Sequence, residues 1–203
     1  YRLARLSWND EIVATLSPPE QRIGPAKITP PPGSFLQATQ HGETSLIETV
    51  GNILKSASPV LDLFSGCGTF SLPLAQMAEI HAVEGEADML AALDKAWRKT
   101  QGLKKISHEK RDLFRRPLLP DELNKFEAAV IDPPRAGAEA QVTMLAKSTI
   151  KTLAYVSCNP VSFARDAKIL TDAGYSLEAV TPVDQFRWSY HVELVGAFHK
   201  AAA

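Results

Sequence analysis

From residue 60 onward, the chain alternates between short apolar runs and longer segments with helical spacing, and this order limits the possible folds most strongly. Strands are predicted at the apolar runs 60–64, 80–84, 105–109, 128–132, 152–157, 175–184 and 192–199. Helices are predicted between them at 69–77, 87–100, 139–148 and 160–173. Repeated strand–helix units build a parallel sheet with helices on both faces. We therefore expect an α/β fold with a mostly parallel, seven-stranded sheet.

The first 40 residues differ from the rest because they are rich in proline. Two pieces within them, 11–16 and 26–29, have a strand-like composition. We interpret residues 1–40 as the remnant of a β-rich neighbouring domain with a linker, whose partner strands need not lie in this chain. Residues 41–203 form the predicted main domain, which opens with a helix at 43–55. The chain does not begin with Met, so we expect a fragment of a longer protein.

Composition and charge exclude several classes of protein. Hydrophobic residues make up 45% of the 203 residues, which is enough for one globular domain with a buried core. No apolar run approaches the roughly 20 residues of a membrane span, and the net charge of −1 gives no global sign of nucleic-acid binding. The two cysteines, Cys67 and Cys158, cannot form a zinc or iron–sulfur site alone. We expect no membrane partner, no metal and a reducing, cytoplasmic location.

A loop with two glycines follows the first predicted strand of the main domain. Residues 62–68 read Asp-Leu-Phe-Ser-Gly-Cys-Gly, and Gly66 and Gly68 allow the backbone to turn and to approach a ligand closely. Ligands of doubly wound sheets bind at the carboxyl ends of the strands, where this loop lies. The third glycine of the dinucleotide fingerprint is missing, as is the lysine of a phosphate-binding loop. Alone, the loop fits a tight strand–helix turn as well as a ligand site.

Three acids around this loop favour the ligand site. Glu84 ends the next predicted strand and lies 18 residues after Gly66 (84 − 66 = 18), close to the ~20 expected for an acid that binds ribose hydroxyls. Asp112 follows the third strand, where it could receive an adenine amino group. Asp62 would repel a pyrophosphate but suits a cationic ligand such as S-adenosylmethionine. The pattern therefore indicates a nucleoside-like, positively charged cofactor.

Cys158 lies between the predicted strand at 152–157 and a helix that Pro160 starts. A thiol near a helix N-terminus should have a pKa below its usual value of ~8.5, which favours a nucleophilic thiolate. A lone cysteine is more often a small buried apolar residue, but the place at a strand's carboxyl end favours catalysis. Cys67 lies inside the glycine loop, and we interpret it as a buried structural residue.

Two further motifs carry polar groups towards the same end of the sheet. Residues 132–135, Asp-Pro-Pro-Arg, form a rigid, extended corner after the fourth predicted strand, although such a corner can also be a plain turn. His191 and Glu193 are two apart in the last predicted strand and should face the same side, either towards a site or towards solvent. Arg187, Trp188 and Tyr190 just before them suit an RNA base or strand.

These motifs resemble those of the S-adenosylmethionine-dependent RNA uracil-5-methyltransferases, which make 5-methyluridine in tRNA and large-subunit rRNA. The resemblance extends from residue 35 to 198 and includes the ordered motifs at 35–39, 62–70, 132–137, 157–160 and 184–193. Three positions depart from the family pattern: Thr39 stands for Asn, Arg187 for Pro and Ser189 for Thr. The resemblance implies a Rossmann-like methyltransferase fold, an S-adenosyl-L-methionine cofactor and tRNA or rRNA as partner.

The resemblance also implies a role for each motif residue. Cys158 would add to carbon 6 of a flipped uracil, and Glu193 would remove the proton from carbon 5. The implied cofactor-binding residues are Gln37, Asp62, Phe64, Gly66, Gly68, Glu84, Asp112 and Asp132. The implied substrate-binding residues are Gln37, Asp132, Pro133, Arg135 and His191.

Other activities remain possible from the residues alone. RNA cytosine-5-methyltransferases usually carry a further cysteine in the fourth-strand motif, where this chain has Arg135. Adenine or guanine N-methyltransferases use a similar Asp-Pro-Pro corner, but an aromatic residue follows it and no thiol is needed. A module that binds cofactor and RNA without catalysis is a third alternative, and the oligomeric state is open.

Overall fold

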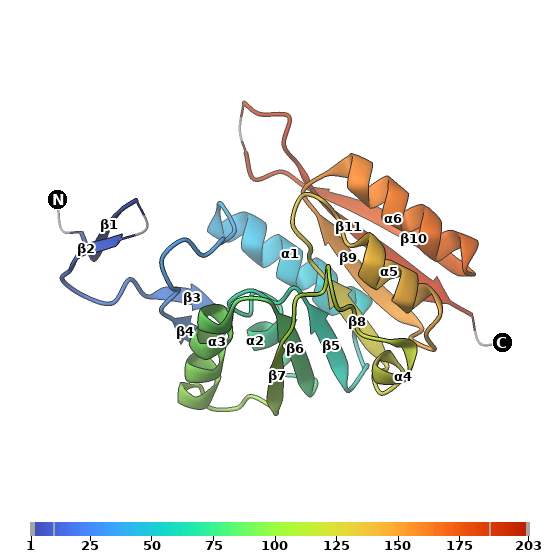
Figure 1. Cartoon of the computed structure of the whole chain (residues 1–203), viewed down its shortest axis with the longest axis horizontal. Helices are drawn as coiled ribbons and strands as arrows, with labels where there is room; N and C mark the ends of the chain where they lie inside the picture. Colours follow the sequence, from blue (N-terminus) through green and yellow to red (C-terminus); the bar gives the residue numbers. More distant parts are fainter. Residues whose placement is uncertain (1–2, 10, 187, 202–203) are drawn as a thin grey trace.

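The computed structural model describes residues 3–9, 11–186 and 188–201 of the chain. Its centre is a seven-stranded sheet in the order β10-β11-β9-β8-β5-β6-β7 (Figure 1). The strands are β5 (Val60–Leu63), β6 (Ile80–Glu84), β7 (Ile106–Lys110), β8 (Ala128–Ile131), β9 (Thr152–Ser157), β10 (Tyr175–Val183) and β11 (Glu193–Lys200). Strands β5 to β9 are parallel, whereas β11 runs antiparallel to both β9 and β10. The predicted mostly parallel sheet of seven strands is confirmed.

Six helices flank the sheet within the described residues: α1 (Gln40–Ile53), α2 (Ser71–Leu74), α3 (Ala87–Lys99), α4 (Pro120–Leu123), α5 (Glu139–Ala146) and α6 (Pro160–Asp172). Thr39 caps α1, because its Oγ1 accepts a hydrogen bond from the Gly42 N–H at 3.0 Å. The helix predicted at 69–77 is reduced to the single turn α2, and the short α4 was not predicted. No helix of the described ranges is long and apolar enough to cross a membrane.

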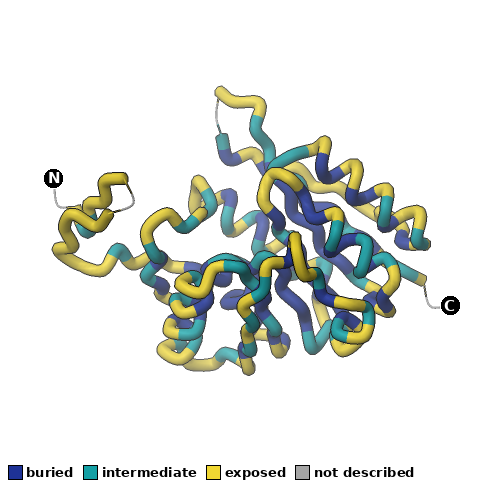
Figure 2. The backbone as a smooth tube through the Cα atoms, in the orientation of Figure 1, coloured by how far each residue is buried: buried dark blue, intermediate teal, exposed yellow. Residues whose placement is uncertain are grey.

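Most of the central strands are buried (Figure 2). Their apolar residues belong to two clusters, one on each face of the sheet. On one face, Val60 belongs to a cluster with Leu46 of α1 and Leu93 of α3. On the other face, Leu61 belongs to a second cluster that includes Val142 of α5. Because successive strand side chains point to opposite sides, one strand supplies both clusters. Both faces are therefore covered by helices, as predicted.

The N-terminal segment forms two small antiparallel hairpins, β1–β2 (Arg5–Trp8 and Glu11–Thr15) and β3–β4 (Gln21–Ile23 and Ala26–Ile28). The prediction identified β2 and β4 but missed their partners, which have only four and three residues. Each of these four strands therefore has its partner inside this segment. Hairpin β3–β4 buries Ile23 and Ile28 in the core cluster that includes residues of α3, whereas β1–β2 is largely exposed.

Candidate active site

A cavity of about 720 Å³ opens at the carboxyl ends of the parallel strands, which we call the strand-end cavity. Its walls come from the ends of β5 to β9, the start of β11 and the segment before α1. The lining residues are Phe35, Gln37, Phe64, Ser65, Gly66, Cys67, Thr69, Glu84, Gly85, Glu86, Met89, Arg111, Asp112, Leu113, Phe114, Asp132, Pro133, Pro134, Arg135, Cys158 and Glu193. Ten of the thirteen predicted site residues line this one cavity, and Asp62, Gly68 and His191 do not.

Glu84 anchors the glycine loop to the end of β6. One carboxylate oxygen accepts a hydrogen bond from the Gly66 N–H at 2.9 Å, and the other accepts from the Glu86 N–H at 3.0 Å. Gly66 has a φ of +54°, in the left-handed region that glycine adopts without strain. A carboxylate offers about four acceptor positions, so Glu84 can shape the loop and still accept ligand hydroxyls.

Gly68 and Asp62 do not line the cavity, but both make contacts that hold the glycine loop in place. A Cβ atom at Gly68 would lie 2.0 Å from the Leu93 Cδ1, so glycine is required for α3 to pack against the loop. Asp62 is fully buried, and its Oδ2 accepts a hydrogen bond from the Ser71 hydroxyl at 2.6 Å. Within the described residues its Oδ1 has no partner, and burial raises the pKa of Asp62 to about 7. Their direct contact with a cofactor stays a prediction.

Two aromatic rings form part of the wall of the strand-end cavity. The rings of Phe64 and Phe114 lie 5.4 Å apart between centroids. Asp112 is exposed, and its Oδ1 accepts hydrogen bonds from the backbone N–H groups of Phe114 at 3.0 Å and Arg115 at 3.2 Å. Asp112 therefore holds the turn that presents Phe114. Phe114 was not among the predicted site residues, although its place after the third strand and close to Asp112 was a usable signal.

Strand pairing brings Cys158 and Glu193 together. In the antiparallel pair β9–β11, Ser157 lies opposite Leu194. One further step in this register places Cys158 beside Glu193, the first residue of β11. Glu193 is only 4% exposed and Cys158 is half-buried. The structure therefore joins a thiol and a carboxyl group that are 35 positions apart (193 − 158 = 35).

The predicted low pKa of Cys158 is wrong. Burial raises the pKa of this thiol, and the negative charges of Glu193 and Asp132 raise it further. Arg135 acts in the opposite direction, but it does not dominate. Burial also raises the pKa of Glu193, and burial together with Glu193 and Asp62 raises the pKa of Asp132 to about 8. The pKa of each of these three groups is therefore shifted towards the protonated form.

Helix α6 holds the Asp-Pro-Pro-Arg corner in place. The Arg135 carbonyl accepts hydrogen bonds from the Asn159 Nδ2 at 3.0 Å and the Ser162 hydroxyl at 3.1 Å. Asp166 is fully buried, and it accepts from the Ala138 N–H at 2.7 Å. Since Asn159 also caps α6 directly after Cys158, the corner and the thiol are fixed by the same helix.

His191 lies outside the strand-end cavity. Strand β11 begins at Glu193, so the prediction that His191 and Glu193 share one face of a strand is wrong. The ring of His191 contacts Tyr190, with centroids 4.5 Å apart, and is half-exposed. Trp188 and Tyr190 are exposed on this loop, and Arg187 lies outside the described residues.

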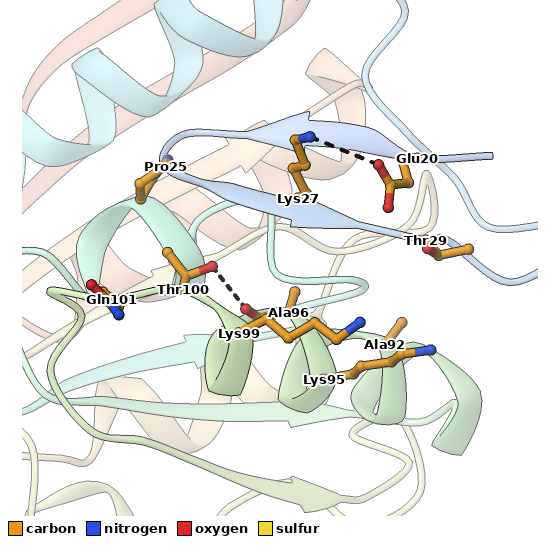
Figure 3. Close-up of a pocket in the computed structure, with 10 residues that line it drawn as sticks. All are labelled: Glu20, Pro25, Lys27, Thr29, Ala92, Lys95, Ala96, Lys99, Thr100 and Gln101. Atoms are coloured by element: carbon orange, nitrogen blue, oxygen red, sulfur yellow. Dashed lines mark hydrogen bonds and ion pairs between the residues drawn. The ribbon is translucent and has the colours of Figure 1, made fainter. Parts of the chain in front are cut away.

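A second hollow of about 460 Å³ lies between hairpin β3–β4 and the later turns of α3 (Figure 3). We call it the α3 groove. Its charged lining consists of Lys27, Lys95, Lys99 and Glu20, and the Lys27 Nζ lies 4.0 Å from a Glu20 carboxylate oxygen. No thiol, histidine or aromatic side chain is among its lining residues. In the described part of the chain, no group of three acidic, histidine or cysteine residues could hold a metal ion.

The chain is similar in sequence to RNA methyltransferases. The family model described as tRNA (Uracil-5-)-methyltransferase matches residues 28–201. An uncharacterized RNA methyltransferase of Mesorhizobium japonicum is 52% identical over 97% of this chain and 48% of its own length. The 23S rRNA (uracil(1939)-C(5))-methyltransferase RlmD of Shewanella halifaxensis is 37% identical over 85% of this chain and 39% of its own length. The chain thus spans about half the length of the curated relatives it matches, or less.

A solved structure has the same fold. The Pyrococcus abyssi tRNA (uracil-54, C5)-methyltransferase, in complex with S-adenosyl-L-homocysteine, superimposes with a TM-score of 0.79. The match covers 93% of this chain and 46% of that one at 24% sequence identity. The similarity confirms the predicted Rossmann-like architecture.

Proposed function

Because the chain belongs to the tRNA (uracil-5-)-methyltransferase family, we propose that its protein methylates carbon 5 of a uridine in tRNA or rRNA. The methyl donor would be S-adenosyl-L-methionine, and the reaction would pass through a covalent bond between Cys158 and the uracil. The observation that carries this proposal is the pairing of Cys158 with Glu193 inside the cavity that the glycine loop also lines. The relatives named above include both a tRNA and an rRNA enzyme, so both substrates stay in the proposal.

The residues fit the proposed cofactor. Five carboxyl groups and two guanidinium groups line the cavity, so its walls favour a positively charged ligand. When bound, the cofactor would supply an electrophilic methyl group. Glu84 would accept ribose hydroxyls, Phe64 and Phe114 would pack against the adenine ring, and Gly66 would allow close approach. In this assignment Asp62 and Gly68 hold the glycine loop in place and do not line the cofactor site.

Carbon 5 of uracil is a poor nucleophile, and Cys158 would activate it. Addition of its thiolate to carbon 6 moves electron density to carbon 5. The thiol must first lose its proton, and a neighbouring carboxylate would accept it. The positive charge of Arg135 partly offsets the burial and the negative charges that raise the thiol pKa. After methyl transfer, Glu193 would remove the carbon-5 proton, and the thiolate would leave by elimination.

We also propose a division of the chain. Residues 41–203 would form the catalytic domain, and residues 1–40 would be the remnant of a β-rich neighbouring domain with a linker. The burial of β3–β4 against the core that includes α3 supports a fixed attachment of this remnant.

A covalent trap tests the proposed function. RNA with 5-fluorouridine at the target has no removable proton at carbon 5, so the complete protein should form a stable adduct on a denaturing gel when cofactor is present. Cys158→Ala should form none. Cys67→Ala, which removes the other free thiol, should still form the adduct. An adduct in Cys158→Ala would contradict the mechanism, and an absence of adduct in the wild type would favour a non-catalytic binding module.

A further inference from the structure

Gln185 is a buried polar residue next to the strand-end cavity, and it was not among the predicted site residues. It lies between β10 and β11 and is only 7% exposed. A Cβ atom at Gly42 would lie 2.4 Å from the Gln185 Cγ, so the start of α1 packs directly against this side chain. The close packing leaves Gln185 little freedom to change its rotamer.

The backbone determines which way the Gln185 amide points. Its Oε1 accepts a hydrogen bond from the Thr39 N–H at 3.4 Å, and a backbone N–H can only donate. The Nε2 of Gln185 must then face the other way, where it donates to the Gln37 Oε1 at 2.7 Å. The two amides, 148 positions apart in the chain, therefore have a defined relative orientation.

This arrangement occupies the Gln37 oxygen and leaves the Gln37 NH2 group to donate to a ligand in the cavity. Gln37 lines the cavity together with Cys158 and Asp132. Its oxygen is occupied by Gln185, and none of the described residues accepts a hydrogen bond from its Nε2. Uracil carries a carbonyl oxygen at carbon 4, which accepts, whereas cytosine carries an amino group there, which donates. A wall that offers an N–H donor therefore suits uracil and opposes cytosine.

We propose that Gln185 is a specificity-determining residue: it holds the Gln37 amide so that the cavity favours uracil over cytosine. The proposal rests on the proposed uracil methylation. Gln185 itself does not line the cavity, so it acts through Gln37 and is a positioning residue.

Two substitutions of Gln185 in the complete protein test whether this residue orients the Gln37 amide. In Gln185→Glu, a carboxylate with no donor can only accept, so Gln37 must turn its NH2 group towards residue 185 and its oxygen towards the cavity. Gln185→Met keeps a side chain of similar length but removes both hydrogen bonds. The measurement is the rate of adduct formation with RNA that carries 5-fluorouridine or 5-fluorocytidine at the target position.

The wild type should strongly prefer uridine. Gln185→Glu should lower the uridine-to-cytidine rate ratio by about 10- to 100-fold, because the reoriented amide opposes the uracil carbonyl. Gln185→Met should lower it by less, since the freed amide can adopt both orientations. Gln37→Glu should lower the ratio in the same way, and it tests the donor if Gln185→Glu does not fold. Circular dichroism and a cooperative thermal unfolding transition identify the folded variants.

The outcomes separate the two proposals. Folded Gln185 variants with the wild-type ratio would overturn the role of Gln185. A wild-type protein that forms no adduct with either RNA would instead overturn the proposed methylation.

Discussion

The strand-end cavity and the α3 groove are both hollows on the surface of the chain, yet only the cavity combines groups that could perform chemistry. The cavity collects a thiol, acids and aromatic rings from seven separate segments. The α3 groove is built by one hairpin and one helix, and its charges are lysines and a single glutamate (Figure 3). Helix α3 borders both hollows, since Glu86 and Met89 line the cavity while Lys95 and Lys99 line the groove.

Concavity alone therefore does not make an active site. At the strand ends, burial raises the pKa of Cys158, Asp132 and Glu193, and neighbouring negative charges raise the pKa of Cys158 and Asp132 further. In the groove, Lys95 and Lys99 are exposed to solvent, and screening weakens their interactions. Substitutions in the cavity should therefore change activity, whereas substitutions in the groove should change little.

The largest effect is expected for Glu193→Gln in the complete protein. Without the general base, cysteine addition and methyl transfer can still occur, but elimination should slow by about 10²–10⁴-fold. A covalent RNA complex carrying a radiolabelled methyl group should then accumulate on a denaturing gel. If Glu193→Gln turned over at the wild-type rate, Glu193 would not be the general base.

A smaller loss is expected for Glu84→Ala. The variant loses the acceptor for ligand hydroxyls and both loop anchors, at Gly66 and Glu86. Affinity for S-adenosylhomocysteine, measured by calorimetry, should fall by about 1.5–3 kcal/mol. Glu84→Gln keeps the size and one acceptor oxygen, so its loss should be intermediate. Lys99→Ala in the α3 groove should bind the ligand like the wild type. A loss of affinity equal to that of Glu84→Ala would show that the groove contributes to cofactor binding as much as the cavity does.

The stability of the fold should depend on pH through Asp132. Its pKa is about 8 in the folded chain against an ordinary value of 3.8, so the unfolded chain binds fewer protons between pH 4 and pH 8. The free energy of unfolding should therefore decrease as pH rises through this window. The full effect is about 1.4 kcal/mol per pH unit, and partial exposure of Asp132 reduces it.

Asp132→Asn removes this contribution. Between pH 5 and pH 7, the unfolding free energy of the variant should decrease by about 1–2 kcal/mol less than that of the wild type. Urea denaturation at several pH values measures the difference. Lys99→Ala serves as the control and should follow the wild-type pH dependence. Parallel curves for wild type and Asp132→Asn would contradict the high pKa.

The smallest effect is expected in the α3 groove. Lys95 and Lys99 are one turn apart on α3, and like charges at this spacing repel. Lys95→Glu should replace this repulsion with an attractive pair and stabilise the fold by about 0.3–0.5 kcal/mol in thermal or urea unfolding. Cofactor affinity should stay within twofold of the wild type. A tenfold loss of RNA affinity would show that the groove contributes to substrate binding.

Much of the fold could be predicted because local signals agreed with the tertiary structure. Pro160 and Asn159 start α6 where the sequence indicated, and the apolar runs became buried strands. The short strands β1 and β3 were missed because three or four residues carry too little pattern. The helix expected at 69–77 shrank to one turn that contains Pro73.

The alternating fold, the glycine loop and the identity of the chemical groups could be predicted from the sequence alone, because they depend on periodicity and residue type over short stretches. Which groups meet depends on long-range contacts of the folded chain. The β9–β11 register sets Glu193 beside Cys158, and Gln185 reaches Gln37 across 148 positions. The direction of the Cys158 pKa shift also depends on the tertiary structure. The pKa is raised and not lowered, because folding buries the thiol and brings Glu193 and Asp132 close to it from distant parts of the sequence.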